Sequence, residues 1–277
     1  REYEKAKIEY LSALRLQPTN SAAIVQLGKI LFRQGQLREA APFLIEGRKR
    51  APGDLEVANN LGVIYVAARE FAKARAEAEA VLALSPTNEM ALLILADTAQ
   101  TPADNAAILQ TIRALEQRAG PQAAIHLARA QLAMKLRETS TAEAELKRAI
   151  ALDSKSVMAR QMLGNLRWSA GQVEAAEQEF RAAAQLAPPD DSAHYRLATF
   201  LKRTGKLEEA KKVLDEINRS APERTAAWVD RAEIALAEKQ FDECARLINR
   251  ALAQAPGDTD AKVLQAQLKL NEKKPAE

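Results

Sequence analysis

Side chains that could perform chemistry are few in this sequence, and they lie far apart. Its only histidines are His126 and His194, and its only cysteine is Cys244. Their separation gives no spacing typical of metal ligands. The sequence also has no glycine-rich phosphate loop and no G-x-S-x-G nucleophile motif. We therefore expect no catalytic residue, no metal site and no cofactor.

The acidic runs and the single thiol have simpler interpretations than catalysis. Residues 177–179 and 208–209 are typical of solvated helix faces. The pair Asp190-Asp191 is typical of a helix start, because carboxylates are favoured near helix N-termini. Cys244 stands where a repeated pattern elsewhere has Ala176, which predicts a small buried side chain and not a nucleophile.

Composition and charge narrow the class of protein. The 277 residues carry a net charge of +3, and 47% of them are hydrophobic but only 4% aromatic. A core of mainly Ala and Leu favours helices over strands. Because no domain is strongly basic, we expect no nucleic-acid partner. The apolar runs are too short to span a bilayer, which predicts no direct membrane insertion and leaves cytoplasmic and periplasmic locations open.

The element that would position any functional side chain is a 34-residue unit, seen most fully in Val157–Asp190. Its first half, to Ala170, has apolar residues at a helical spacing. Gly171 permits a turn, and a second apolar face follows over 172–186 until Pro188 and Pro189 stop the helix. Two helices joined by so short a turn lie antiparallel and need neighbours to bury their apolar faces.

The rest of the chain repeats this unit. Six prolines recur in register with its period: Pro18, Pro52, Pro86, Pro188, Pro222 and Pro256. We predict an all-α solenoid of about seven full repeats with a half-repeat at each end, which we treat as a single domain over residues 1–277. The predicted units are 1–20 (half-repeat), 21–54, 55–88, 89–120, 121–156, 157–190, 191–224, 225–258 and 259–277 (terminal helix, from Asp260 to about Leu270).

Two of these units depart from the pattern. The unit 89–120 is two residues shorter than Val157–Asp190, with Ala96 in place of the glycine and a turn at Thr101-Pro102. The unit 121–156 is two residues longer, and we place its extra residues near Lys135–Thr139. The deficit and the excess cancel, so the later prolines keep the period. We expect 89–120 to be the least stable unit and leave open whether 89–156 acts as a hinge.

The sequence resembles the tetratricopeptide repeat, whose 34-residue pattern has Trp, Leu-Gly and Tyr, then Ala, an aromatic residue and Pro in fixed places. Leu163-Gly164, Ala176, Phe180 and Pro188 match this pattern, and so do Leu27-Gly28, Leu61-Gly62 with Tyr65, and Trp228. A pentatricopeptide RNA binder is the nearest alternative. Its period is one residue longer, and we would expect it to be more basic.

The resemblance implies a right-handed superhelix whose first helices line a concave groove that binds proteins or peptides. Carried over to this chain, the polar groove positions are Gln26, Lys29, Arg33, Asn59, Asn60, His126, Arg129, Gln161, Asn165, Trp168, Tyr195, Arg196, Thr199, Arg203, Asp230 and Glu233. Taken one by one, each is interpreted more simply as solvated surface. The group from Gln161 to Arg203 is harder to dismiss, since it puts amides, an aromatic and two arginines on adjacent first helices.

Arginine and amide side chains suit an extended peptide and its carboxylates. We therefore expect the group from Gln161 to Arg203 to be the main contact surface. Some relatives bind chaperone tails through two asparagines on successive repeats. Here Lys29 precedes Asn60, and Asn165 precedes Arg196, so neither pair is complete and we predict no binding of chaperone tails.

Three functions are compatible with these features. The first is a non-catalytic scaffold that holds an extended peptide or a helix of a partner in the groove. The second is a periplasmic scaffold of an exopolysaccharide export system, which arrays of this Ala-, Leu- and Arg-rich kind resemble. The third is the partner-recruitment region of a larger enzyme such as a glycosyltransferase. Both ends fall within a repeat, so we expect a longer, bacterial protein, and its oligomeric state is left open.

Overall fold

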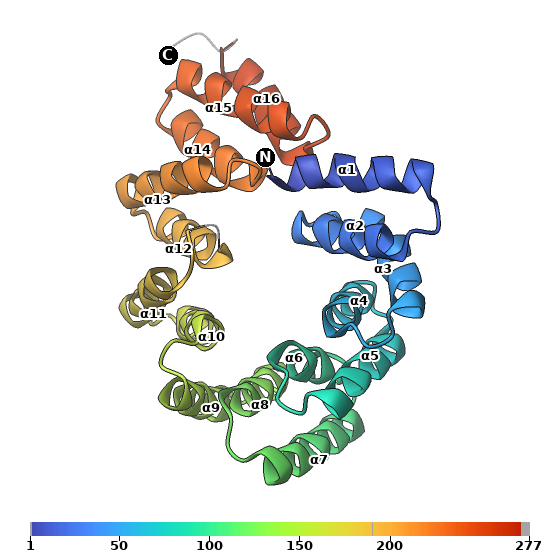
Figure 1. Ribbon diagram of the computed structural model, residues 1–277. Helices are drawn as coiled ribbons and strands as arrows, with labels where there is room; N and C mark the ends of the chain where they lie inside the picture. Colours follow the sequence, from blue (N-terminus) through green and yellow to red (C-terminus); the bar gives the residue numbers. More distant parts are fainter. Residues whose placement is uncertain (1, 190, 273–277) are drawn as a thin grey trace. The chain divides into compact units, whose positions relative to one another are not determined.

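The computed structural model describes residues 2–189 and 191–272 of the protein (Figure 1). This part of the chain forms sixteen α-helices and has no β-strand, which confirms the predicted all-α class. The helices are α1 (Glu2–Leu16), α2 (Ser21–Arg33), α3 (Leu37–Arg50), α4 (Leu55–Ala67), α5 (Phe71–Leu84), α6 (Glu89–Asp97), α7 (Pro102–Ala119), α8 (Ala123–Lys135), α9 (Thr139–Leu152), α10 (Val157–Ser169), α11 (Val173–Leu186), α12 (Ser192–Arg203), α13 (Leu207–Ser220), α14 (Thr225–Ala237), α15 (Phe241–Gln254) and α16 (Thr259–Glu272).

The predicted helix–turn–helix unit is confirmed in α10 and α11. Ser156 caps α10 by accepting a hydrogen bond from the backbone N–H of Ala159, which satisfies one of the free donors of the first turn. After α10 the chain reverses at Gly171, whose φ of 76° lies in the left-handed region that a side chain disfavours. The helix pair is therefore set by a polar cap at its start and by a glycine at its turn.

Close packing of the helix pair depends on Gly164. A Cβ atom at this position would lie 3.1 Å from Cε1 of Phe180, tighter than ordinary van der Waals contact. Phe180 is 1% exposed, and Ala176, one turn earlier on α11, is fully buried. The small residues thus let α10 and α11 approach, and the phenyl ring fills the space between them.

The first helices of the repeats begin at an almost constant interval, and only α12 begins one residue out of register. Their first residues are Ser21, Leu55, Glu89, Ala123, Val157, Ser192, Thr225 and Thr259. The predicted position of the two extra residues near Lys135–Thr139 is wrong. The helices α8 and α9 and the turn between them have the lengths seen in α2 and α3. The extra residues are 121 and 122, which precede α8, so the regular repeat covers 123–156.

The residue with positive φ also recurs at this interval. Gly35, Gly171 and Gly205 occupy it in three repeats, and Arg69, Arg137 and Lys239 occupy it in three others with φ near 60°. A side chain in the left-handed region costs free energy. The fixed length of the turn therefore imposes this backbone conformation even where the sequence lacks glycine.

The unit that begins at Glu89 differs from the others in the lengths of its two helices. Helix α6 has 9 residues and α7 has 18, against 13 and 14 in α2 and α3. Helix α6 packs more extensively against α8 than against α7. Helix α7 is thus held mainly at its N-terminus and through the buried side chains of Ile108, Ile112 and Leu115.

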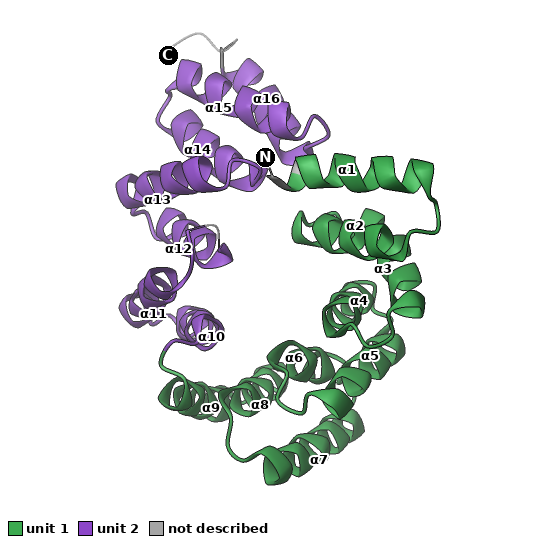
Figure 2. Ribbon diagram, viewed as in Figure 1, with its two compact units in different colours: residues 1–154 green, residues 155–277 purple. Residues whose placement is uncertain are grey.

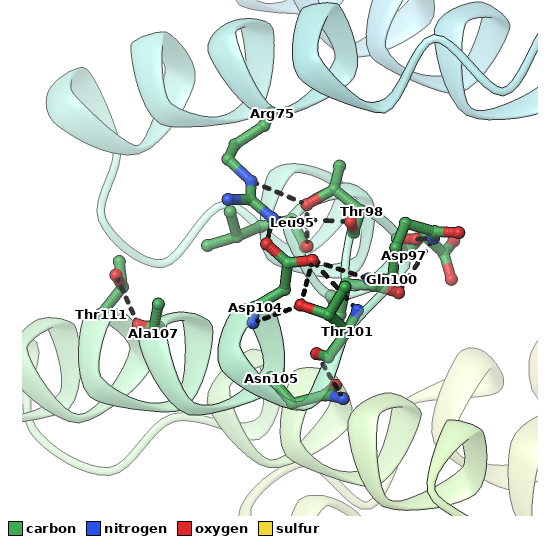
Figure 3. Close-up of polar contacts among 12 residues, drawn as sticks. Arg75, Leu95, Asp97, Thr98, Gln100, Thr101, Asp104, Asn105, Ala107 and Thr111 are labelled. Atoms are coloured by element: carbon green, nitrogen blue, oxygen red, sulfur yellow. Dashed lines mark hydrogen bonds and ion pairs between the residues drawn. The ribbon is translucent and has the colours of Figure 1, made fainter.

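A polar network fixes the start of α7 (Figure 3). Thr101 and Asp104 form a capping box, in which each side chain accepts a hydrogen bond from the other's backbone N–H. Arg75 of α5 donates to Asp104 at 3.1 Å and to the hydroxyl of Thr98 at 3.2 Å. The hydrogen bonds from Thr101 and Arg75 lower the pKa of Asp104 to about 2, so this cap stays ionised in mild acid.

The chain divides into two compact units, residues 1–154 and 155–277 (Figure 2). The core of the first unit contains clusters around Leu44 and around Ile125, and that of the second contains clusters around Phe200 and around Ile248. The assignment of the whole array to one domain stays a prediction. No helix in the described part of the chain is both long and apolar enough to cross a membrane.

Candidate functional site

The predicted contact group has Trp168 at its centre. The indole packs edge-on against Phe180 and Phe200, with ring centroids 6.2 and 5.1 Å away. Arg203 of α12 also contacts the indole, and its Cζ atom is 5.8 Å from the ring centroid. A cation over an indole face is a favourable contact. Helices α10 and α12 are thus joined by an aromatic cluster that ends in an arginine.

The amides of α10 lie deeper than a contact surface requires. Gln161 is 4% exposed, and its Nε2 atom has no hydrogen-bond partner among the described residues. Asn165, one turn further on, is half-buried. A buried amide with an unused donor is costly. Gln161 therefore belongs to the packing between helices, and Asn165 is the amide that is accessible to a partner.

The α12 part of the group is more accessible. Arg196 and Arg203 are exposed and form no ion pair among the described residues. Asp191 caps the helix by accepting from the N–H of Ala193, as predicted for an acidic start, whereas Asp190 lies outside the described residues. Thr199, which lies between the two arginines in the sequence, is half-buried. Two exposed guanidinium groups on one helix suit carboxylates of a partner.

A second network connects α12 with α14. Lys202 forms ion pairs with the carboxylates of Asp230 and Glu233, the latter at 2.7 Å. Burial alone would lower the pKa of Lys202, but its hydrogen bonds to these two carboxylates and their charges raise it above its ordinary value. Burial and then a hydrogen bond to Asp230 raise the pKa of Tyr195 as well. The network therefore favours the protonated forms of both groups.

This network predicts a loss of stability in alkali. A raised folded-state pKa contributes stability that is complete below the unfolded pKa, about 10 for tyrosine, and that disappears as the pH rises through the folded pKa. We expect the urea midpoint of the wild type to fall more steeply above about pH 10 than that of Tyr195→Phe. Tyr65, whose pKa is also raised by burial, is present in both proteins and cancels. Equal slopes would contradict the prediction.

The sequence interpretation missed a hollow beside this network. It has a volume of about 190 Å³ and lies among α12, α14 and α16. Val229, Val263 and Leu264 form its apolar part. Its polar lining is mostly acidic and comprises Tyr195, Asp230, Glu233, Asp258, Asp260 and Gln267. In the sequence, Asp230 and Glu233 are predicted as separate groove positions. Adding the charges over the three adjacent first helices would have indicated an acidic site here.

The predicted groove cations of the first unit are already paired. Lys29 contacts Asp54 at 2.8 Å and Glu56 at 2.9 Å, and Arg33 contacts Glu56 at 2.9 Å. These residues come from α2 and α4 and from the cap between α3 and α4. Lys29 is only 11% exposed at its side chain, so it serves the junction between two repeats. Gln26 is exposed on α2.

The asparagines of α4 take structural positions. Asn59 donates to the side chain of Asn88 at 3.1 Å, and Asn88 in turn caps α6. Asn60 is 9% exposed, and its Nδ2 atom has no partner among the described residues. With Lys29 ion-paired and Asn60 buried, this pair does not present two free amides. The absence of chaperone-tail binding stays a prediction.

The predicted positions on α8 are also occupied by contacts within the chain. His126 is buried, and its Nδ1 atom lies 2.6 Å from a carboxylate oxygen of Glu145 on α9. Arg129 is paired with Glu116 of α7. Among the described residues there is no group of three side chains that could hold a metal ion. His126 and Arg129 thus stabilise junctions within the first unit, whereas Arg196 and Arg203 of the second unit are exposed and form no ion pair among the described residues.

Pairs of antiparallel helices that restart at a constant interval and carry polar side chains on their first helices define a helical-repeat protein that presents surfaces to partners. Family models described as tetratricopeptide repeat match residues 25–89 and 127–191, residues 167–228, and residues 225–268. The chain belongs to the tetratricopeptide repeat family. These ranges leave out residues 90–126, where α6 is short and α7 is long.

Solved structures show the same fold. Yeast Tom70 is 13% identical with a TM-score of 0.66, and the match covers 98% of this chain and 59% of that one. The APC/C hetero-tetramer Cut9–Hcn1 is 14% identical with a TM-score of 0.51, covering 96% of this chain and 52% of that one. A tetratricopeptide repeat protein from Parabacteroides merdae is 20% identical with a TM-score of 0.51, covering 98% and 92%.

At these identities the likeness establishes the solenoid fold of tetratricopeptide repeats and nothing finer. The chain spans about half the length of the Cut9–Hcn1 chain that it matches, 52%. The comparison with curated proteins finds no match. Family and fold together make the protein a protein-interaction scaffold.

Proposed function

We propose that the protein is a non-catalytic scaffold that holds an extended peptide or a helix of a partner on the face formed by its first helices. The observation that carries the proposal is the pair of exposed arginines on α12, Arg196 and Arg203, which lack ion pairs among the described residues. Arg203 also lies over the half-buried Trp168. An arginine side chain can bind a carboxylate of the partner, and the indole provides a flat apolar contact within the same surface. The export-scaffold and enzyme-recruitment alternatives stay predictions.

The surface also has a direction. The exposed arginines are on α12, and the acidic residues that line the hollow come from α14, from α16 and from the residue before α16. Lys202 offsets only part of the acidic charge, because Asp258 and Asp260 are not among its partners. A segment with an acidic residue on the α12 side and a basic residue towards α16 fits this order.

The test uses the whole chain as bait in extracts of the source cell. We expect the partners that the wild type retains to bind the double variant Arg196→Ala/Arg203→Ala about tenfold or more weakly. This corresponds to a loss of about 1.4 kcal/mol or more of binding free energy. The control is Arg219→Ala/Arg250→Ala, which removes two exposed arginines from the second helices α13 and α15. If both double variants retain the partner as the wild type does, the proposed surface is wrong.

A further inference from the structure

A second hollow lies in the first compact unit. It has a volume of about 640 Å³ and is formed by α3, the end of α4 and the start of α5. Its apolar lining includes Ala41, Ile45, Ile64 and Tyr65. Ile45 is 39% exposed, although it is a large apolar side chain. We call this feature the α3–α5 hollow.

At the equivalent positions of several other repeats, polar side chains make contacts between neighbouring repeats. The residues one repeat before and one repeat after Ala41 are Lys7, which donates to Gln36 at 3.1 Å, and Arg75, which contacts Asp104 at 3.1 Å. In the second unit, two of the equivalents are Glu177, paired with Lys206 at 2.7 Å, and Lys211, paired with Glu238 at 2.9 Å. Ala41 cannot make such a contact.

The position of Ile45 shows the same contrast. Two of its equivalents in the second unit are Arg181, which is paired with Glu209 at 2.5 Å, and Asp215, which is paired with Arg231 at 3.2 Å. At the junction of α3 and α5, both polar positions are therefore replaced by apolar residues. Hollows also lie at the equivalent places one and two repeats later, but each is smaller, about 350 Å³, and has a charged residue in place of Ile45: Glu79 in one and Arg113 in the other.

The rim of the hollow carries a charge with no counter-charge among the described residues. Three charged residues line the hollow: Arg38, Glu70 and Lys73. Glu70 and Lys73 form an ion pair with each other, and the Lys73 Nζ atom lies 5.4 Å from the centroid of the Tyr65 ring. Arg38 is exposed and has no partner among the described residues. A guanidinium next to an apolar floor selects a ligand that is both apolar and anionic.

We propose that the α3–α5 hollow binds an acidic amphipathic segment of a partner protein. A large apolar side chain of that segment occupies the floor between Ile45 and Ile64, and a neighbouring carboxylate pairs with Arg38. Apolar anchors buried in a pocket and flanked by a charge pair are typical of binding hot spots. This surface lies mainly on second helices, so it is independent of the function proposed for the first-helix face.

The repeat pattern itself provides a variant that closes the hollow. Ala41→Lys places an ammonium opposite Glu70, and these two residues are as far apart in the sequence as Lys7 and Gln36. Ile45→Glu places a carboxylate opposite Lys73, and these two are as far apart in the sequence as Arg181 and Glu209. Both positions are at least partly exposed, so the double variant keeps the core intact. Its circular dichroism and urea midpoint, compared with the wild type, verify folding.

Two matched helical peptides are the probes. Each presents Leu and Phe one turn apart on one face, followed on that face by Glu in one peptide and Lys in the other. We expect the Glu peptide to bind the full chain, and to bind about tenfold or more weakly to Ala41→Lys/Ile45→Glu and to Arg38→Glu. We expect the Lys peptide to bind Arg38→Glu more tightly than it binds the wild type. Arg118→Glu, an exposed arginine of α7 outside the hollow, is the control and should change nothing.

Any of the following results would overturn the proposal. The first is equal binding of the Glu peptide to the wild type and to the closed double variant, or no binding to the wild type at millimolar concentration. The second is equal binding of the two peptides to the wild type. The third is a dimer of the wild type in sedimentation velocity that the closed double variant lacks, because the hollow would then hold a second copy of this chain.

Discussion

Phe180→Ala is expected to destabilise the second compact unit by about 3–5 kcal/mol, the usual cost of removing a buried phenyl ring. The ring is 1% exposed and is packed against Gly164, Trp168 and Phe200. Its removal leaves a cavity at the junction of α10, α11 and α12. Because Trp168 rests on this ring, the variant should also loosen the contact between the indole and Arg203.

Both tryptophans of the chain, Trp168 and Trp228, belong to residues 155–277. Urea unfolding followed by tryptophan fluorescence therefore reports on the second unit. The matched control is Leu186→Ala on the same helix, where the side chain is 39% exposed and the expected loss is below about 1 kcal/mol. If Phe180→Ala costs no more than Leu186→Ala, the ring does not hold this junction together.

The second large effect concerns hydrogen exchange. We expect the amides in the middle of α7 to exchange about a hundredfold or more faster than those in the middle of α11, because exchange follows the free energy of local opening. Helix α7 packs sparsely against both α6 and α8. Helix α11 buries Ala176, Phe180, Ala183 and Ala184 against α10 and α12.

The N-terminal turn of α7 supplies an internal control for this measurement. Arg75→Met removes the guanidinium that contacts Asp104 and Thr98. It should speed exchange at the first turn of α7 and leave α11 unchanged. Equal protection of α7 and α11 in the wild type would contradict the prediction, and would show that the greater length of α7 compensates for its sparse packing.

The constant period of the repeat made most of the fold predictable. Proline and glycine mark where a helix must stop or turn, so the start of each first helix follows from their spacing. The division of residues within the unit that begins at Glu89 was not predictable in this way. Thr101, Pro102 and Asp104 start α7 early and shorten α6, and this local cap overrides the pattern of the other repeats.

The candidate site was less predictable than the fold. Groove positions carried over from a family show which residues share a face, but not which of them are already paired. Lys29 and Arg129 looked available in the sequence, and each is held by a carboxylate of a neighbouring helix or cap. Several ion pairs join residues 28 or 29 positions apart, as in Arg181–Glu209 and Lys206–Glu177. A search for opposite charges at that separation would have found them.

The constant interval between first helices also bears on how such a protein can change over time. The unit that begins at Glu89 has a shortened and a lengthened helix, yet the next first helix still begins one full interval later, at Ala123. Two cuts one interval apart therefore leave chain ends of matching geometry. Unequal recombination could add or remove a whole repeat without breaking a helix, and the surfaces on the remaining repeats would keep their chemistry.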